Sequence, residues 1–188
     1  MQLRPTYPVR TERLALRPLT DADVDALLSY RGRPDVCRYL PFEPMTRERL
    51  LERLSTDLGT TEISAEGQAL TLGAELADTG ELIGDVVLFF HSEAQSGGEL
   101  GYVFTPDMRG QGYATEACRA MLALAFDGLG LHRIVARIDP RNDSSVRLAE
   151  RLGMRLEAHF VRNERLKGEW IDELIYAQLA DEWHARTT

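Results

Sequence analysis

The spacing of apolar residues changes twice in the first part of the chain. Leu14 and Leu16 fall on one face of the alternating segment 12–17, which predicts a strand that a proline ends. From residue 20 the apolar positions take helical spacing behind a threonine and two aspartates, a typical helix start. A second helix is predicted over 46–58, and the proline-rich segment between the two helices is expected to be irregular.

The middle of the chain returns to strand spacing. Two apolar segments, residues 69–77 and 81–90, flank a turn sequence and predict a hairpin. A further strand over 99–105 leads into a loop with two glycines. The elements predicted after this loop are a helix over 114–125, a strand over 132–139, a helix over 142–152 and two strands over 154–161 and 169–179.

The order of these elements predicts an α+β fold. We expect a single domain over residues 1–188, built on one mixed, mostly antiparallel sheet of about seven strands with helices on both faces. No internal repeat or low-complexity tract interrupts it. The hydrophobic fraction of 44% and the charged fraction of 28% are those of an ordinary globular protein.

Net charge limits the possible partners. The formal charge of −8 argues against general nucleic-acid binding, because such binding needs a basic surface. A negative field suits a cationic partner such as a protonated amine. A phosphate-bearing ligand would have to be held by local groups that act against the overall charge.

The sequence predicts neither export, membrane insertion nor metal binding. No apolar run follows the first residues, and no stretch approaches the roughly 20 apolar residues that span a bilayer, so we expect a cytoplasmic protein without membrane contact. Cys37 and Cys118 are too few and too far apart for a disulfide framework or a metal cluster. His91, His132 and His159 share no metal-ligand spacing, so no metal is expected.

The candidate chemistry lies in the loop that follows the strand over 99–105, which reads Arg109-Gly110-Gln111-Gly112-Tyr113-Ala114-Thr115. The first N–H groups of a helix have no partners within the helix, and the helix dipole adds positive partial charge, so this end of a helix binds phosphate well. Glycines allow the backbone to approach a ligand, and Arg109 can add a charge-assisted contact.

Two familiar phosphate-binding loops do not fit this segment. The Walker loop needs Gly-Lys followed by Ser or Thr, which is absent here. The dinucleotide-binding fingerprint needs a glycine or alanine at the position of Thr115, and it belongs to a repeated βαβ array that this chain does not predict.

The pattern Arg/Gln-x-x-Gly-x-Gly/Ala does fit, and it is met by Arg109, Gly112 and Ala114. Together with Asn142 and a closing Leu-Gly-Met at 152–154, these residues resemble the GNAT superfamily of acyl-CoA-dependent N-acetyltransferases. Flanking segments are similar to the Rim-type ribosomal-protein N-terminal acetyltransferases, namely Glu99-Leu100-Gly101-Tyr102, Gly112-Tyr113-Ala114-Thr115-Glu116-Ala117, Leu131-His132-Arg133-Ile134 and Asn142-Asp143-Ser144-Ser145. The resemblance covers nearly the whole chain.

The resemblance implies acetyl-CoA as acyl donor and suggests which residues bind it. Tyr102, Val103 and Phe104 lie where the family's fourth strand bulges and separates from the fifth, so that main-chain groups pair with the pantetheine arm. Asn142 is implied to hydrogen-bond the cofactor near its acetyl-bearing end, a role compatible with that of a helix N-cap. The residues implied to hold the pyrophosphate are Arg109, Gly110, Gln111, Gly112, Tyr113, Ala114 and Thr115.

The resemblance further implies direct attack of a neutral amine on the thioester. Glu99 is the candidate base, with a charged strand-edge residue as the alternative interpretation. A main-chain N–H near Val103 or Phe104 is the candidate for stabilising the oxyanion. Many family members have a tyrosine where this chain has Ala149. Ser145, the matching hydroxyl in Rim-type enzymes, is then the candidate acid, with simple binding as its alternative role.

The sequence alone leaves three functions open. The acceptor can be a protein N-terminus, or it can be a small amine such as a polyamine or an antibiotic, because Rim-like chains acetylate both kinds. The missing tyrosine at Ala149 also leaves a non-catalytic acyl-CoA-binding or regulatory module. The expected partner is an amine-bearing substrate, and the chain is expected to be a monomer or a homodimer.

Overall fold

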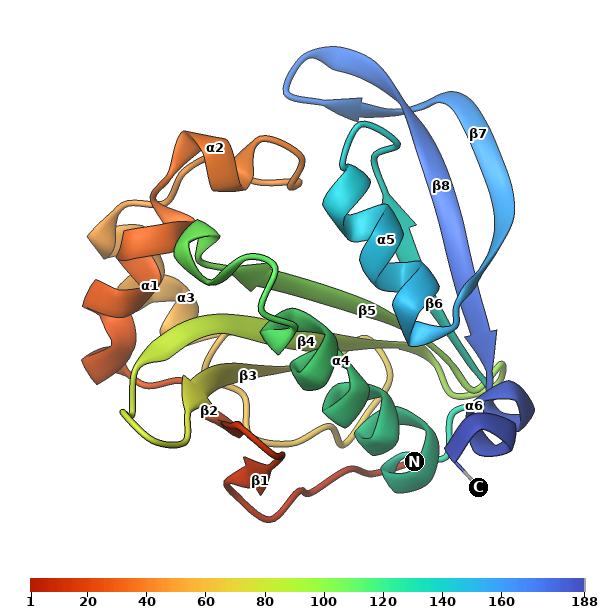
Figure 1. Cartoon of the computed structure of the whole chain (residues 1–188), viewed down its shortest axis with the longest axis horizontal. Helices are drawn as coiled ribbons and strands as arrows, with labels where there is room; N and C mark the ends of the chain where they lie inside the picture. Colours follow the sequence, from red (N-terminus) through yellow and green to blue (C-terminus); the bar gives the residue numbers. More distant parts are fainter. Residues whose placement is uncertain (188) are drawn as a thin grey trace.

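The structure, a computed structural model, describes residues 1–187, and their strands form one eight-stranded sheet in the order β1-β2-β3-β4-β5-β6-β8-β7 (Figure 1). Neighbouring strands are antiparallel except β5 and β6, which run parallel. The predicted α+β fold is confirmed, and the strand beyond the predicted set is the two-residue β1. The strands are β1 (Val9–Arg10), β2 (Leu14–Pro18), β3 (Ala69–Leu76), β4 (Leu82–Ser92), β5 (Gly97–Phe104), β6 (Arg133–Ile138), β7 (Arg155–Leu166) and β8 (Glu169–Leu179).

The helices of the described residues are α1 (Val24–Arg31), α2 (Pro34–Cys37), α3 (Arg47–Leu54), α4 (Tyr113–Ala123), α5 (Asp143–Leu152) and α6 (Ala180–Thr187). Residues of α4 and α5 cluster with Leu100 of β5, whereas residues of α1 and α3 cluster with Val103 of the same strand. Because successive strand side chains point to opposite faces, the two helix pairs cover opposite faces, as predicted. The apolar spacing does not predict α2, which is a single turn, or the mostly polar α6. None of the helices in residues 1–187 is long and apolar enough to cross a membrane.

Local sequence signals set several helix ends. The Thr46 side chain caps α3 by accepting a hydrogen bond from Arg49 N at 3.3 Å. Asn142 caps α5 in the same way, accepting from Ser145 N at 3.3 Å. Gly153 ends α5 with φ +86°, a conformation that glycine adopts without steric cost. These three predicted helix boundaries are confirmed.

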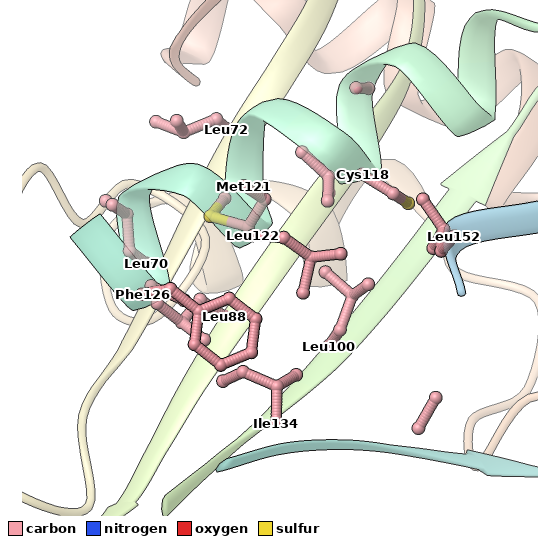
Figure 2. Close-up of a cluster of buried hydrophobic side chains, with 14 of the residues drawn as sticks. Leu70, Leu72, Leu88, Leu100, Cys118, Met121, Leu122, Phe126, Ile134 and Leu152 are labelled. Atoms are coloured by element: carbon pink, nitrogen blue, oxygen red, sulfur yellow. The ribbon is translucent and has the colours of Figure 1, made fainter. Parts of the chain in front are cut away.

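The main core lies between α4 and the sheet (Figure 2). Cys118, Met121 and Leu122 of α4 are buried together with Leu72 of β3 and Leu88 of β4. Each buried side chain of leucine size contributes roughly 1.5–3 kcal/mol relative to an exposed one. This packing holds α4 against the sheet and thereby fixes the position of its N-terminal end.

Strands β5 and β6 separate in the middle of the sheet. They pair only where Gly97–Glu99 lies opposite Arg133–Val135. Beyond this point β5 stays paired with β4 as far as Phe104, whereas β6 stays paired with β8 as far as Ile138. Because the two strands follow different neighbours, a gap opens between them.

The bulge predicted at residues 102–104 is not present. The register between β4 and β5 is continuous from Gly98 to Phe104, and its irregularity lies between Phe90 and Ser92. The separation of β5 from β6 therefore results from their different neighbours rather than from an extra residue in β5.

The last two strands form the predicted hairpin, but its first strand is longer than expected. β7 continues to Leu166, past the predicted end at residue 161, and its register with β8 shifts between Phe160 and Glu164. The polar residues around this shift break the alternation that identifies a strand, which explains the early predicted end.

Candidate functional site

A cleft of about 1830 Å³ opens where β5 and β6 separate, next to the N-terminal ends of α4 and α5. Ser145 lines this cleft, whereas Gln111 and Glu99 do not. Of the residues implied to bind the cofactor, the cleft is lined by Tyr102, Val103, Phe104, Arg109, Gly110, Gly112, Tyr113, Ala114, Thr115 and Asn142. The fold therefore brings together three segments that are separate in the sequence.

The two loop glycines are required by the backbone conformation. Gly110 has φ +78°, and Gly112, the N-cap of α4, has φ +84°. A Cβ at Gly110 would meet no atom within 4 Å, and one at Gly112 would meet only the Arg13 guanidinium at 3.4 Å. The space in front of the loop is thus left open to a ligand.

The loop offers unpaired backbone donors. Arg109 N already donates to Pro106 O at 3.1 Å, and Glu116 N donates to Gly112 O at 3.0 Å. Unpaired N–H groups at a helix start, combined with the helix dipole, form a site for an anion such as phosphate. Within residues 1–187, no hydrogen bond is donated by the backbone N–H groups of Gly110, Gln111, Gly112, Tyr113 and Ala114.

A carboxylate in the first turn of α4 is neutralised by its neighbours. Glu116 accepts hydrogen bonds from Thr11 Oγ1 at 2.6 Å, Arg13 N at 2.7 Å and Arg13 Nε at 2.8 Å. Burial raises the pKa of Glu116, but the hydrogen bonds from Thr11 and Arg13 outweigh burial and lower it. Arg13 also donates to the Gln111 carbonyl at 3.0 Å and lies 4.4 Å from the centre of the Tyr113 ring. These contacts hold the loop against the β1–β2 connection.

The cleft has a local excess of positive charge, although the whole chain carries −8. This local excess is what a phosphate-bearing ligand needs in an acidic protein. The arginines that line the cleft are Arg10, Arg13, Arg38, Arg109, Arg119, Arg141, Arg147 and Arg151. The lining carboxylates are fewer and are those of Glu12, Asp35, Glu116, Asp127 and Asp143.

Asn142 keeps one end of its amide free. Its Oδ1 accepts hydrogen bonds from Ser144 Oγ at 2.8 Å and Ser145 N at 3.3 Å, which is the N-cap role. Its Nδ2 has no acceptor in the described part of the chain, and the residue lines the cleft. The cap role therefore leaves a donor that can serve a ligand.

Main-chain groups of β5 face the gap at alternate residues. Thr105 N donates to Ile83 O on β4 at 2.9 Å. Because alternate residues of an antiparallel strand turn their main chain to opposite sides, Val103 pairs with β4 as well, while Tyr102 and Phe104 turn toward the gap. Of the two candidates for the oxyanion N–H, only Phe104 faces the gap.

The Tyr102 hydroxyl is shielded from solvent and forms no hydrogen bond of good geometry with residues 1–187. The Ser145 hydroxyl, which lines the same cleft, forms none either. The pKa of Tyr102 is raised, mainly by burial and then by the Cys118 thiol, while Ser145 and Arg151 act against the rise. A buried hydroxyl without a partner costs roughly 1–3 kcal/mol.

Glu99 lies on the other face of the sheet. Its neighbour Leu100 points into the α4 cluster, so Glu99 points away from it. Glu99 Oε2 lies 3.1 Å from His91 Nε2 and 3.3 Å from Arg137 Nε. Arg137 also donates to Glu173 Oε1 at 2.9 Å. Since Glu99 is the last residue of β5 paired with β6, this polar cluster begins where the gap opens.

The sequence did not associate His91, Arg137 or Glu173 with Glu99. The turn between β4 and β5 could have indicated that His91 lies near Glu99, because the length of a turn sets the register of the two strands that it joins. Arg137 and Glu173 join the cluster through the pairing of β6 with β8, for which the local sequence carries no signal.

The tip of the β7–β8 hairpin meets α2 beside the cleft (Figure 1). Lys167 Nζ donates to the Cys37 carbonyl at 2.6 Å and lies 3.6 Å from Glu43. The Arg141 guanidinium lies 5.7 Å from the centre of the Tyr39 ring, and both residues line the cleft. Polar contacts therefore hold the rim formed by α2 and the hairpin. Nowhere in residues 1–187 do three His, Cys, Asp or Glu side chains form a group able to hold a metal ion.

Comparison with known proteins identifies the family. A model of the acetyltransferase (GNAT) domain matches residues 13–155. This chain belongs to the GNAT acetyltransferase family. The uncharacterized N-acetyltransferase YnaD of Bacillus subtilis is 32% identical over 176 residues, which cover 94% of this chain and 99% of YnaD.

Solved GNAT structures have the same fold over nearly the whole chain. A GNAT-family acetyltransferase from Bacillus anthracis has a TM-score of 0.83 and 30% identity, covering 97% of this chain and 100% of its own. The spermidine N-acetyltransferase of Vibrio cholerae, solved with CoA and spermine, has a TM-score of 0.79 and 23% identity, covering 93% of this chain and 99% of its own.

Family membership makes the chain an N-acetyltransferase with acetyl-CoA as donor, as the sequence predicted. The residues present fit this cofactor, because a loop with unpaired amides and an arginine-rich lining suits its phosphates.

Proposed function

We propose that this GNAT enzyme transfers the acetyl group to a primary amine by direct attack, with cofactor and acceptor meeting at the gap between β5 and β6. One observation carries the proposal. The cleft that contains the anion-binding loop, on the α4 side of the sheet, opens where β5 leaves β6, and Glu99 lies at this point on the opposite face as the last residue of β5 paired with β6. An amine bound near Glu99 can therefore approach an acyl group held from the other side.

Acetyl-CoA supplies an acetyl group activated as a thioester. In the proposal, Arg109 and the unpaired amides of residues 110–114 hold its pyrophosphate. The gap-facing main chain of Tyr102 and Phe104 pairs with the pantetheine arm. The free Nδ2 of Asn142 donates a hydrogen bond near the acetyl-bearing end.

The amine must lose a proton before it attacks. A protein α-amine has a reference pKa of ~8 and a lysine of ~10.4, so most of either is protonated at neutral pH. We assign the base to Glu99, with His91 at 3.1 Å as the exposed partner that exchanges protons with solvent. The N–H of Phe104 stabilises the oxyanion, and Ser145 donates to the departing sulfur. The amine proton reaches Glu99 through bound water, because Glu99 lies five positions before Phe104 along β5.

Among primary amines, we propose a protein N-terminal α-amine as the acceptor. The Rim-like segments around Glu99, Gly112 and Asn142 support this acceptor. A small polycationic amine is the second candidate, which the carboxylates of Glu99 and Glu173 beside the gap favour.

A thiol-release assay against a panel of amines tests the proposal. The panel contains peptides with free N-termini, the same peptides with blocked N-termini, spermidine and an aminoglycoside. We expect thiol release with free but not with blocked peptides. Release with spermidine alone would favour the second candidate. Coenzyme A binding without thiol release from any amine would overturn the catalytic proposal in favour of a binding module.

A further inference from the structure

The Tyr102 hydroxyl is buried and has no hydrogen-bond partner of good geometry in the free protein, and Ser145 is among the side chains that act on the pKa of Tyr102. Tyr102 lies on the helix-facing side of β5, the side of Leu100. Ser145 lies in the first turn of α5, on the helical face that also carries the buried Leu148 and Ala149. Both hydroxyl-bearing residues line the cleft.

A buried tyrosine and the neighbouring serine of α5 show how such hydroxyls can be paired in this chain. The fully buried Tyr30 donates to an aspartate carboxylate at 2.7 Å. Ser144, the residue before Ser145, donates to Asn142 Oδ1 at 2.8 Å. A buried tyrosine and a serine of this fold can therefore be paired, whereas the buried Tyr102 hydroxyl is not.

The two hydroxyls can take complementary roles. Burial is the main cause of the raised pKa of Tyr102, so the phenol stays protonated and can act as a hydrogen-bond donor. A serine hydroxyl can accept one hydrogen bond and donate another. Successive hydrogen bonds polarise one another, so a bond from Tyr102 to Ser145 strengthens the bond that Ser145 donates.

We propose that Tyr102 is a positioning residue, which donates to Ser145 Oγ and directs the Ser145 O–H toward the sulfur of the cofactor. This inference rests on the proposed function. Ala149 stands where many family enzymes have a tyrosine, and here β5 supplies a phenol from the neighbouring element. The amine nitrogen adds to the thioester carbonyl and forms the tetrahedral oxyanion, and the amine proton goes to Glu99. When this adduct collapses and the C–S bond breaks, Ser145 stabilises the electron pair that the sulfur keeps.

The test compares Tyr102→Phe, Ser145→Ala and the double variant with two matched controls, Tyr30→Phe and Ser144→Ala. Calorimetry measures the affinity for coenzyme A relative to desulfo-coenzyme A as pH rises through the ordinary thiol pKa near ~8.5. In this ratio of affinities, the contributions of all contacts that the two ligands share cancel, and only the contribution of the sulfur remains. Thermal unfolding of the free proteins is measured in parallel.

In the wild type we expect the ratio to rise with pH, because the sulfur-facing donor favours the thiolate. This rise is lost to a similar extent in Tyr102→Phe, in Ser145→Ala and in the double variant. Each of the three also lowers kcat about tenfold, with KM for acetyl-CoA unchanged. Tyr102→Phe leaves the free protein as stable as the wild type or more so, whereas Tyr30→Phe destabilises it. Ser144→Ala keeps the rise.

Three results would overturn the inference. The ratio could rise with pH equally in Tyr102→Phe, the effects of the two substitutions could simply add, or Tyr102→Phe could unfold as easily as Tyr30→Phe. A wild-type protein that binds neither coenzyme A nor its desulfo analogue would overturn the proposed function as well, so the two failures are distinguishable.

Discussion

Arg13 and Glu116 join the β1–β2 connection to the first turn of α4. The backbone N and the Nε of Arg13 lie 2.7 and 2.8 Å from the two carboxylate oxygens of Glu116. The same guanidinium contacts the Gln111 carbonyl and the Tyr113 ring. One arginine therefore neutralises the carboxylate nearest the proposed phosphate site and holds the loop that forms this site.

This pairing predicts a pH-dependent contribution to stability. Burial raises the pKa of Glu116, but hydrogen bonds from Thr11 and Arg13 outweigh burial, so the folded-state pKa is lowered. The stabilisation is complete above the unfolded glutamate pKa near ~4.3 and is lost as pH falls through the folded value. We expect Glu116→Gln to lower the free energy of unfolding by about 1–2 kcal/mol near neutral pH and by much less at about pH 3.

Chemical denaturation at both pH values measures this effect. Glu12→Gln is the matched control, because Glu12 is an exposed carboxylate beside the same arginine, with which it forms no hydrogen bond, and it should change the stability far less than Glu116→Gln at neutral pH. A difference between wild type and Glu116→Gln that is the same at both pH values would contradict the assignment.

The left-handed conformation of Gly112 predicts a loss of cofactor affinity on substitution. A glutamate there places a side chain and a negative charge at the proposed phosphate site. We expect Gly112→Glu to weaken coenzyme A binding by at least about a hundredfold, near 2.7 kcal/mol, in calorimetry. Gly80→Glu is the control, because Gly80 has φ +74° and a Cβ there would meet no atom within 4 Å, in a hairpin turn away from the cleft. Equal affinities of the two variants would count against the loop as the phosphate site.

The position of Glu99 predicts a change in the pH–rate profile. We expect Glu99→Gln to lower kcat/KM by about a hundredfold, most strongly at low pH, where less of the amine is neutral. Glu157→Gln serves as the control, because Glu157 is also a carboxylate on the sheet and pairs with Arg133 at 3.2 Å. If Glu99→Gln keeps the wild-type profile, another group is the base.

The buried pair of Arg31 and Asp85 predicts a large effect on stability alone. Arg31 Nε donates to Asp85 Oδ2 at 2.9 Å, and both side chains are almost completely buried between α1 and β4. Arg31→Met leaves the aspartate carboxylate buried without a counter-charge, with Tyr30 Oη at 2.7 Å as its hydrogen-bond donor, at a cost of roughly 3–5 kcal/mol. Arg49→Met, which removes the exposed pair with Glu52, should cost less than about 1 kcal/mol in the same urea titration. Equal costs would mean that burial does not decide the energy of these pairs.

Most of the fold could be predicted because its signals are local. Alternation at 12–17, the N-cap at Thr46 and the glycine after Leu152 each depend on a few neighbouring residues. The separation of β5 from β6 also lies in the expected region of the chain. Its cause, however, differs from the predicted one. The expected bulge is absent because β5 and β6 follow different neighbours, and sheet order depends on pairings between distant segments.

The candidate site likewise has some features with a local sequence signal and others without one. The loop around Gly112 has a sequence pattern because its glycines meet a local backbone requirement. The contact of Arg13 with Glu116 and the cluster of His91 and Arg137 around Glu99 have no such pattern. They arise only when separate strands and helices pack together, so a structure is needed to find them.

A crystal structure of the complex with coenzyme A tests the central claim most directly. We predict that the pyrophosphate accepts hydrogen bonds from the backbone N–H groups of residues 110–114 and that the pantetheine arm enters the gap beside Tyr102 and Phe104. A cofactor bound elsewhere, with the N-terminal end of α4 free, would contradict the account.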